Sequence, residues 1–225
     1  MKKILVLIIV LFSSNVLAHM DHYKKFNKIE MEIFRNGELI GYSYYFFTRK
    51  GDETIVTHQI KFSVKLLGAT IFQVEGYGEE KYVKDQLISY NSKTLQNDKE
   101  KFVNLVFDKD KNKFNIKGSS YNGEASIDNI VGNWWSHKIL QTNSQISPIS
   151  GSIKQQIVTF IGRERIDLYN KMHNVDHFKL QSKDMSLPKD KRLDFDIWYD
   201  SKNFIIKKIS YQRMGLWEYY LKNIE

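Results

Sequence analysis

Apolar and polar residues alternate along most of the chain after residue 27. Residues 28–33 are typical, because Ile29, Met31 and Ile33 alternate with charged side chains. A period of two indicates β-strands that bury one face and expose the other. The segments with this pattern are residues 28–33, 39–49, 54–64, 70–77, 81–84, 87–95, 102–107, 113–117, 153–161, 164–168, 176–183, 193–199, 203–212 and 216–221.

The connections between these segments are short and polar, which predicts hairpins. Asn36-Gly37 is a pair suited to the positive φ angles of a tight two-residue turn, and residues 97–99 and 108–112 are polar turns of similar length. We therefore predict an all-β fold, a strongly curved antiparallel sheet of about a dozen strands that forms a half-barrel or a β-spiral. Such a sheet must close or be covered to protect its edges.

The alternation also indicates which side chains form the core, because polar neighbours on both sides place an apolar residue on the dry face. In residues 193–199, Phe195 and Ile197 alternate with Asp194 and Asp196, so we expect the aspartates on the wet face. The predicted core residues are Val56, Ile60, Phe62, Ile157, Phe178, Leu180, Phe195, Ile197 and Trp217.

One segment departs from the strand period. Residues 133–141 predict a short helix, with Asn133 as its N-cap and Trp134, Trp135 and Ile139 on its apolar side. Two tryptophans on such a segment could seal the open end of a curved sheet, or they could line a hydrophobic mouth. Both interpretations stay open at this point.

The first eighteen residues predict a cleaved export signal. Lys2 and Lys3 precede nine consecutive apolar residues, 4–12, and Ala18 ends the segment with a small residue. Nine residues rise only about 14 Å as a helix, roughly half of what a bilayer core requires. We therefore predict a signal peptide at residues 1–18, a flexible mature N-terminus at 19–27, a single curved β domain at 28–222 and a periplasmic location.

Composition limits the classes of function. The chain has no Cys, so it has no disulfide partner and its core must hold the fold in an oxidising compartment. The formal net charge is +8, and it falls to +6 if Lys2 and Lys3 leave with the signal peptide. Lys outnumbers Arg by 28 to 6 and is scattered, whereas nucleic-acid-binding proteins favour clustered Arg. We therefore predict no nucleic-acid partner.

Four motifs occur in an order that resembles a known family. Residues 35–41 (RNGELIG) form a first hairpin, residues 61–68 (KFSVKLLG) follow, and residues 133–137 (NWWSH) and 197–200 (IWYD) come later. This order resembles the exported bacterial family catalogued as domain of unknown function 6134. The resemblance implies an exported β protein without an assigned activity. It also implies a looser similarity to periplasmic lipoprotein-carrier half-barrels and spiral-sheet envelope-integrity proteins.

Four side chains are candidates for ligand contact: Trp134, Trp135, His137 and His58. His137 adjoins the tryptophans and could orient a polar head group at a hydrophobic mouth. His58 falls on the apolar face of residues 54–64. It is either a core histidine bonded to a hydroxyl or carbonyl group, or a ligand-contacting, pH-responsive one.

These features predict a non-enzymatic periplasmic protein that binds a hydrophobic group. The candidate partners are a lipid or lipoprotein acyl chain, or an envelope protein. Two other functions stay open: a structural envelope-integrity factor with a filled core, and a hydrolase of envelope polymers that uses Asp194 and Asp196. The chain has no phosphate loop, dinucleotide fingerprint or nucleophile elbow. We therefore predict no catalytic residue, no cofactor and no metal site.

The leader generates the first testable prediction. We expect cleavage between Ala18 and His19, because a small residue at the end of a charged and then apolar leader directs the cut. N-terminal sequencing of the protein from the cell envelope should start at His19. A mature protein that retains Met1 would contradict the expectation of a cleaved signal.

Overall fold

The computed structural model describes residues 23–225, and the predicted signal peptide and residues 19–22 lie outside this range. Fifteen strands form one sheet in this part of the chain. Two short 3-10 helices, η2 (His137–Leu140) and η3 (Lys189–Lys191), interrupt the strands. The strands are β1 (Lys28–Arg35), β2 (Glu38–Lys50), β3 (Glu53–Leu66), β4 (Ala69–Val83), β5 (Gln86–Gln96), β6 (Lys99–Asp108), β7 (Lys113–Gly118), β8 (Asn122–Ser126), β9 (Ile130–Val131), β10 (Ser144–Ile146), β11 (Ile153–Leu168), β12 (Lys171–Ser182), β13 (Asp194–Asp200), β14 (Ile206–Gln212) and β15 (Leu216–Ile224).

The sheet consists of two meanders that meet at its middle. One runs from β8 to β1 and the other from β15 to β9, so the strand order is β8-β7-β6-β5-β4-β3-β2-β1-β15-β14-β13-β12-β11-β10-β9. The antiparallel pair of β1 and β15 joins the two meanders. The pair of β9 and β10 is parallel. The two edge strands, β8 and β9, are separated in the sequence only by residues 127–129.

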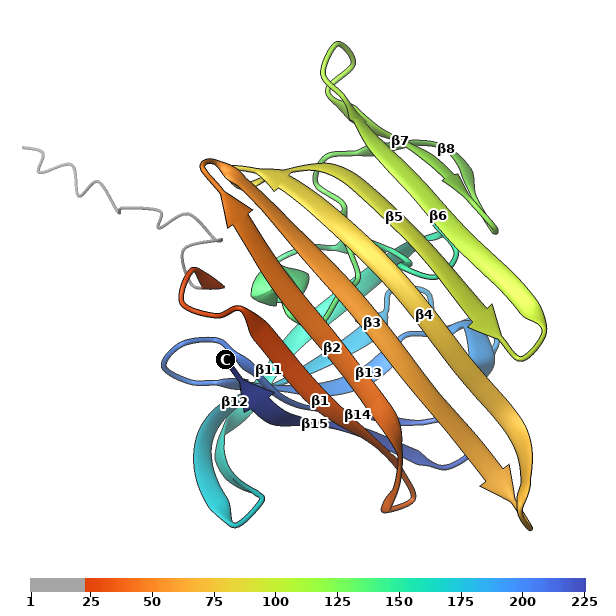
Figure 1. Cartoon of the computed structure of the whole chain (residues 1–225), viewed down its shortest axis with the longest axis vertical. Coiled ribbons are helices and arrows are strands. Elements are labelled where there is room, and N and C mark those ends of the chain that lie inside the picture. Colours follow the sequence, from red (N-terminus) through yellow and green to blue (C-terminus); the bar gives the residue numbers. More distant parts are fainter. Residues whose placement is uncertain (1–22) are drawn as a thin grey trace, which may run out of the picture.

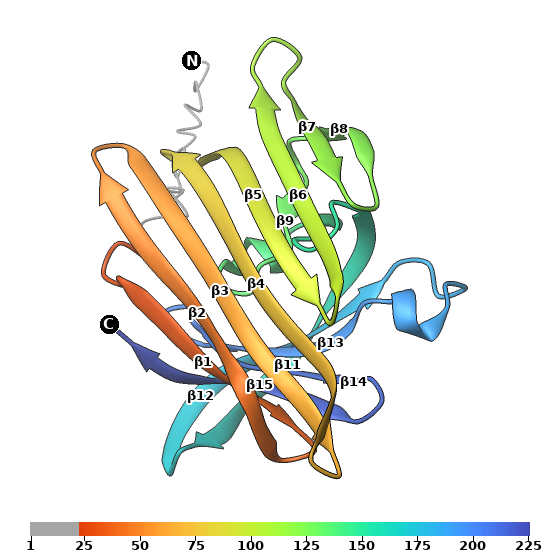
Figure 2. The same cartoon turned by 45° about the vertical axis from the view of Figure 1, so that its right-hand side comes forward.

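Curvature brings the two meanders face to face. In Figures 1 and 2 the strands β1–β6 form one wall, the strands β11–β14 cross behind it, and η2 lies between them. The prediction of an all-β fold built on a strongly curved antiparallel sheet is confirmed. No helix in residues 23–225 combines the length and apolar character that crossing a membrane would require.

The strands differ from the predicted segments in number and length. The count exceeds the predicted dozen because the short strands β8, β9 and β10 carry no clear alternation. Conversely, β4 spans the two predicted segments 70–77 and 81–84. The apparent break between them contains Gly78 and Glu80, which suggest a turn in the sequence, yet Glu80 is only 2% exposed. Strand β11 also joins two predicted segments, through a β-bulge.

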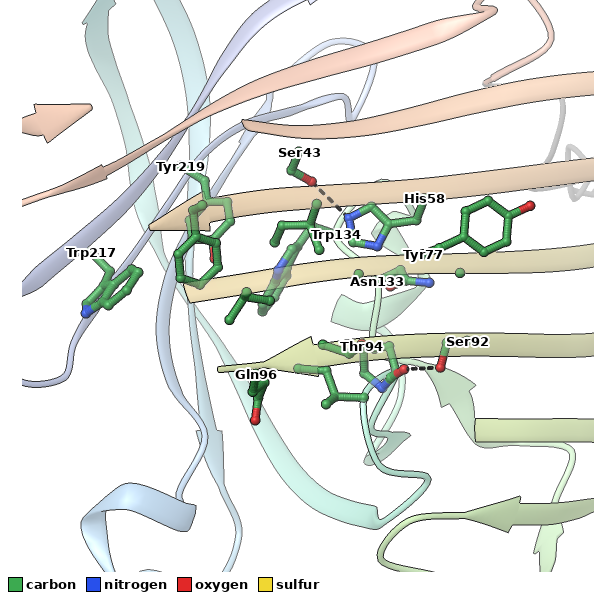
Figure 3. A pocket seen from close by; sticks show the side chains of 18 of the residues that line it. Ser43, His58, Tyr77, Ser92, Thr94, Gln96, Asn133, Trp134, Trp217 and Tyr219 are labelled. Atoms are coloured by element: carbon green, nitrogen blue, oxygen red, sulfur yellow. Dashed lines mark hydrogen bonds between the residues drawn. The ribbon is translucent and has the colours of Figure 1, made fainter. Parts of the chain in front are cut away.

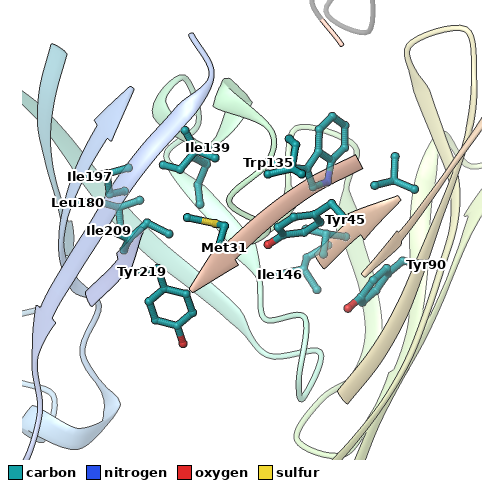
Figure 4. Close-up of a cluster of buried hydrophobic side chains, with 14 of the residues drawn as sticks. Met31, Tyr45, Tyr90, Trp135, Ile139, Ile146, Leu180, Ile197, Ile209 and Tyr219 are labelled. Atoms are coloured by element: carbon teal, nitrogen blue, oxygen red, sulfur yellow. The ribbon is translucent and has the colours of Figure 1, made fainter. Parts of the chain in front are cut away.

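The core fills the concave face of the sheet (Figure 4). Of the predicted core residues, Val56, Phe62, Leu180, Ile197 and Trp217 are buried, and Ile60, Phe178 and Phe195 are partly buried and pack against the core. Figure 4 shows side chains from both meanders and from the segment between them converging in the core. The labelled side chains are Met31, Tyr45, Tyr90, Trp135, Ile139, Ile146, Leu180, Ile197, Ile209 and Tyr219.

The prediction that Ile157 is buried is wrong, because it faces outward and is 52% exposed. Its neighbour Gln156 faces the interior and is 1% exposed. The Gln156 amide donates to the carbonyls of Ile139 at 2.8 Å and Thr142 at 3.0 Å, and it accepts from Gln145 at 2.6 Å. A glutamine that satisfies buried backbone groups is favoured inside, so the apolar residue beside it takes the wet face.

The predicted helix at residues 133–141 is shorter than expected, because η2 covers only His137–Leu140. Its N-cap is Ser136, which makes no side-chain cap hydrogen bond. Asn133 does not cap the helix; its amide donates to Glu80 at 2.6 Å instead. Both tryptophans therefore lie in the turn before η2 rather than on a helix.

The described part of the predicted flexible segment, residues 19–27, is packed against the sheet. Tyr23 is fully buried, and its ring meets the edge of Trp135 at a centroid distance of 5.0 Å. The Arg49 guanidinium donates to the Phe26 carbonyl at 2.7 Å and also bonds the Tyr23 carbonyl. The packed domain therefore begins at least five residues before the predicted boundary at Lys28.

Two isoleucines on opposite faces test this assignment. Ile197 is fully buried and Ile157 is 52% exposed. We expect Ile197→Ala to lower the free energy of unfolding by about 2–5 kcal/mol, because it leaves a cavity in the core. Ile157→Ala should change it by about 0.5 kcal/mol or less. Chemical denaturation of both variants measures the difference, and equal losses would show that the faces are assigned wrongly.

Candidate functional site

A cavity of about 530 Å³ lies between the wall formed by β2–β5 and the strands β14 and β15. A segment that we call the inner segment, residues 132–149, closes one side of it (Figure 3). The lining residues come from β2 (Ser43, Tyr45), β3 (His58, Ile60, Phe62, Val64), β4 (Ile71, Phe72, Val74, Gly76, Tyr77, Gly78), β5 (Tyr90, Ser92, Thr94, Gln96), the inner segment (Gly132, Asn133, Trp134, Pro148, Ile149), and Arg35, Tyr211, Arg213, Met214, Trp217 and Tyr219. Most of this surface is apolar or aromatic.

A row of aromatic rings runs along one wall of the cavity. Trp134 contacts Phe195 edge-on at a centroid distance of 4.9 Å, and Phe195 contacts Tyr211 in the same way at 5.1 Å. Tyr211 stacks on Trp217 at 5.8 Å, and Trp217 meets Phe62 edge-on at 5.4 Å. These contacts hold large, rigid side chains in fixed orientations, which gives a ligand an ordered apolar surface.

Two inward-facing glycines allow close packing in the opposite wall. A Cβ atom at Gly76 would lie 2.9 Å from the Ile60 side chain, and one at Gly78 would lie 3.0 Å from the Tyr90 hydroxyl. Even the smallest side chain would therefore crowd its neighbours at both positions. The glycines let the rings of adjacent strands lean over β4, and both contribute to the cavity lining.

His58 provides the polar feature of this wall. Its Nε2 lies 2.9 Å from the Ser43 hydroxyl, and its ring stacks on Tyr45 at a centroid distance of 4.4 Å. Burial lowers the pKa of His58 to about 4, so the imidazole is neutral at pH 7. The side chain is thus bonded to a hydroxyl, as the first sequence interpretation expects, and it also borders the cavity.

The buried carboxylate of Glu80 holds the inner segment in place. Its Oε1 accepts from the Asn133 amide at 2.6 Å and from the Trp135 indole at 2.8 Å, and its Oε2 accepts from the Tyr82 hydroxyl at 2.5 Å. Burial raises the pKa of Glu80, and these three donors oppose the shift. A carboxylate on β4 thereby fixes the residues on both sides of Trp134.

The four predicted ligand-contacting residues separate into two groups. Trp134 and His58 line the cavity. Trp135 and His137 do not line it. Trp135 is fully buried against Tyr23, Phe47 and Tyr82, so it seals the core.

His137 is turned away from the cavity for a similar reason. It is 8% exposed, its Nδ1 lies 3.3 Å from the Tyr23 hydroxyl, and its ring packs near Phe204. Of the two adjacent tryptophans, Trp134 thus lines the cavity and Trp135 packs in the core.

The cavity lining carries no carboxylate among the residues that the structure describes. Asp194 and Asp196 lie elsewhere, where both accept from the Lys179 ammonium, at 2.8 and 2.9 Å. Asp196 also bonds His177 at 3.0 Å. A Ser–His pair with a histidine pKa near 4 and no orienting carboxylate is a weak general base. The arrangement is suited to binding an apolar group.

Sequence reasoning missed the residues that shape the cavity. Gly76, Gly78 and Glu80 interrupt the alternation of β4 and therefore suggest a turn. The available signal was their spacing of two, since residues 76, 78 and 80 all continue the inward face of Val74. Small or polar residues at inward positions of an otherwise regular strand indicate a ligand or a close backbone approach.

His58 generates a prediction about pH. Its folded pKa of about 4 lies below the ordinary 6.5, so the unfolded chain binds a proton between these values that the folded chain does not. The corresponding stability is fully present above pH 6.5 and is lost as the pH falls toward 4. We expect the free energy of unfolding of His58→Gln to fall less than that of the wild type between pH 7 and 4.5, by about 1–2 kcal/mol. Denaturation curves at both pH values measure this, and parallel losses would contradict it.

Comparison with known proteins agrees with the fold. A solved structure, a β-barrel-like protein of domain of unknown function DUF1849 from Brucella abortus, superposes with a TM-score of 0.58 and 9% identity, covering 88% of this chain and 95% of that chain. No curated protein matches the chain. The family model of the domain of unknown function DUF6134 matches residues 31–222. Because this match spans most of the chain, the protein belongs to the DUF6134 family.

Proposed function

We propose that this protein is a non-enzymatic, periplasmic binding protein for a hydrophobic group, a lipid or lipoprotein acyl chain. The observation that carries the proposal is the apolar cavity of about 530 Å³ that opens at the ends of the strands. Pockets for small ligands measure about 300–1,000 Å³ and combine apolar walls with a few polar groups. This cavity has that character.

The charge distribution of the cavity favours an uncharged chain in its interior. His58 is neutral at pH 7 because burial lowers its pKa to about 4. Pro148 already accepts hydrogen bonds from Tyr90 at 2.9 Å and Ser92 at 2.7 Å, so those hydroxyls are satisfied without a ligand. The two charged lining residues are Arg35 and Arg213. An acyl chain would therefore meet apolar contacts inside and cations near its head.

Two observations favour this function over the alternatives from the sequence. A filled core would leave a structural factor without an open apolar cavity, whereas an apolar cavity of about 530 Å³ is present here. A hydrolase that used Asp194 and Asp196 would need those carboxylates at the binding site, but both are paired with Lys179 outside the cavity. The periplasmic location rests on the leader, whose charge and apolar pattern predict export.

Trp134 offers the direct test. We expect Trp134→Ala to weaken the binding of a long-chain fatty acid tenfold or more, because the loss of a buried aromatic contact removes about 1.5–3 kcal/mol. Isothermal titration calorimetry measures the affinity. A fatty acid brominated on its chain should quench the indole fluorescence of the wild type, and Trp134→Phe should reduce that quenching.

Two control variants separate the site from general effects on the protein. Trp198→Phe should keep the quenching, because Trp198 is not part of the cavity lining. Phe160→Ala removes an aromatic ring that is 53% exposed and is not part of the cavity lining, so the affinity should stay unchanged. Wild-type protein that neither releases heat nor loses fluorescence with the fatty acid would overturn the proposed function.

A further inference from the structure

Three hairpins border the open end of the cavity. The turn between β1 and β2 contributes Arg35 to the lining, and the turn between β14 and β15 contributes Arg213 and Met214. The hairpin of β3 and β4 contributes Val64 and Ile71, which flank its tip. Figures 1 and 2 show these turns at the same end of the curved sheet.

The tips of two of these hairpins carry large apolar side chains in water. Leu67 is 100% exposed and Met214 is 89% exposed, and Leu66 beside them is 60% exposed. Large apolar side chains gathered at one rim mark an interaction surface. The exposure is greatest where the cavity opens, which places this surface at the entrance of the proposed binding site.

Leu67 and Met214 also have an unusual backbone conformation. Leu67 has a φ of 51° and Met214 a φ of 48°, in the left-handed region that favours Gly, Asn or Asp. The matching position of the β1–β2 hairpin holds Asn36, with a φ of 50°, followed by Gly37 as Leu67 is followed by Gly68. Turn chemistry therefore favours asparagine at residue 67, and folding does not account for the exposed leucine.

Cations surround the apolar tips. Arg35 donates to the Met214 carbonyl and lies over the Trp217 ring, 5.9 Å from its centroid. Lys65 and Arg213 are exposed, and no ion pair of residues 23–225 includes any of these three cations.

The same rim also contains a smaller number of opposite charges. Glu38 and Asp98 lie in the turns of this end, where Lys99 adds a further cation. In these four turns, residues 35–38, 65–70, 97–99 and 213–215, four cations accompany two carboxylates. A surface that joins exposed apolar tips to excess cations complements the interface of an anionic bilayer.

We propose that the rim formed by Leu66, Leu67 and Met214 with Arg35, Lys65 and Arg213 docks the open end of the cavity on an anionic lipid surface. This inference rests on the proposed function, because docking would place the entrance of the acyl-binding cavity against the acyl chains of the bilayer. The apolar tips enter the interface, and the cations meet the lipid phosphates.

A vesicle-binding experiment tests the docking. Mature wild-type protein should sediment with vesicles of phosphatidylglycerol and phosphatidylethanolamine, and binding to pure phosphatidylcholine should be at least tenfold weaker. Raising the salt concentration to about 0.5 M should weaken the anionic binding, because salt screens exposed charges. The double variant Leu67→Asn/Met214→Asn should lose at least tenfold in affinity for the anionic vesicles.

The choice of asparagine keeps this test independent of folding. Asparagine adopts the left-handed backbone readily, so the double variant should be as stable as the wild type or more stable. Ile157→Thr is the matched control, since it removes an exposed apolar residue outside the cavity rim and should keep vesicle binding. Equal vesicle binding by the wild type and the double variant would overturn the inference.

The fatty-acid titration separates this inference from the proposed function. The single variant Leu67→Asn, at a residue outside the cavity lining, should bind monomeric fatty acid with wild-type affinity and anionic vesicles more weakly, whereas Trp134→Ala should lose the fatty-acid affinity and still bind vesicles. Wild-type protein that binds the fatty acid but no vesicle overturns the docking alone. Wild-type protein that binds an acylated peptide but no vesicle also overturns it, in favour of a protein partner.

Discussion

The carboxylate of Glu80 is the interaction on which the interior depends. A sheet of two facing meanders leaves a space too wide for its own side chains to fill completely, and the inner segment occupies part of it. That segment has little regular structure, so side chains must fix its position. Glu80 accepts from Asn133, Trp135 and Tyr82, and these charge-assisted bonds compensate for burying a carboxylate without a cation. The burial of Glu80 thus determines where the core ends and the cavity begins.

The consequence is visible in two consecutive residues. Trp135 is anchored by its indole nitrogen and seals the core against Tyr23, while the carbonyl of Trp134 accepts from Tyr199 at 3.0 Å. Because the backbone is held on both sides of Trp134, the side chain of Trp134 cannot turn into the core. Its ring therefore begins the aromatic row that leads through Tyr211 to Trp217 at the rim. The site is preorganised by contacts that lie outside the cavity, which reduces the entropy that a ligand must overcome.

The sequence predicts the fold well wherever burial follows a period of two. It fails where a polar side chain is buried because it forms hydrogen bonds to buried groups. Alternation correctly places Phe62 and Leu180 inside, because each stands between two polar residues. It misplaces Ile157, since Gln156 satisfies carbonyl groups that come from a distant loop. Such partners are separated by many residues, so no local pattern contains them.

The candidate site shows the same limit. His58 could be assigned to the cavity face from alternation alone, but its bond to Ser43 depends on the register of two strands. The Trp134-Trp135 pair marked the right segment, and no local pattern could decide which indole enters the cavity. That decision lies with Glu80, which stands 53 and 55 positions before Asn133 and Trp135, the two residues that its carboxylate binds.

The features that cost stability gather around one place in the molecule. Glycine within a strand lowers stability by roughly 0.5–1 kcal/mol relative to alanine, and the inward glycines Gly76 and Gly78 both line the cavity. A left-handed backbone costs a residue such as leucine about 1–2 kcal/mol, and Leu67 and Met214 adopt it at the rim. A sequence selected for stability alone would place asparagine in the turns. Departures from local rules concentrate at functional sites, which supports the proposal that the open cavity and its apolar rim act together in taking up an apolar ligand.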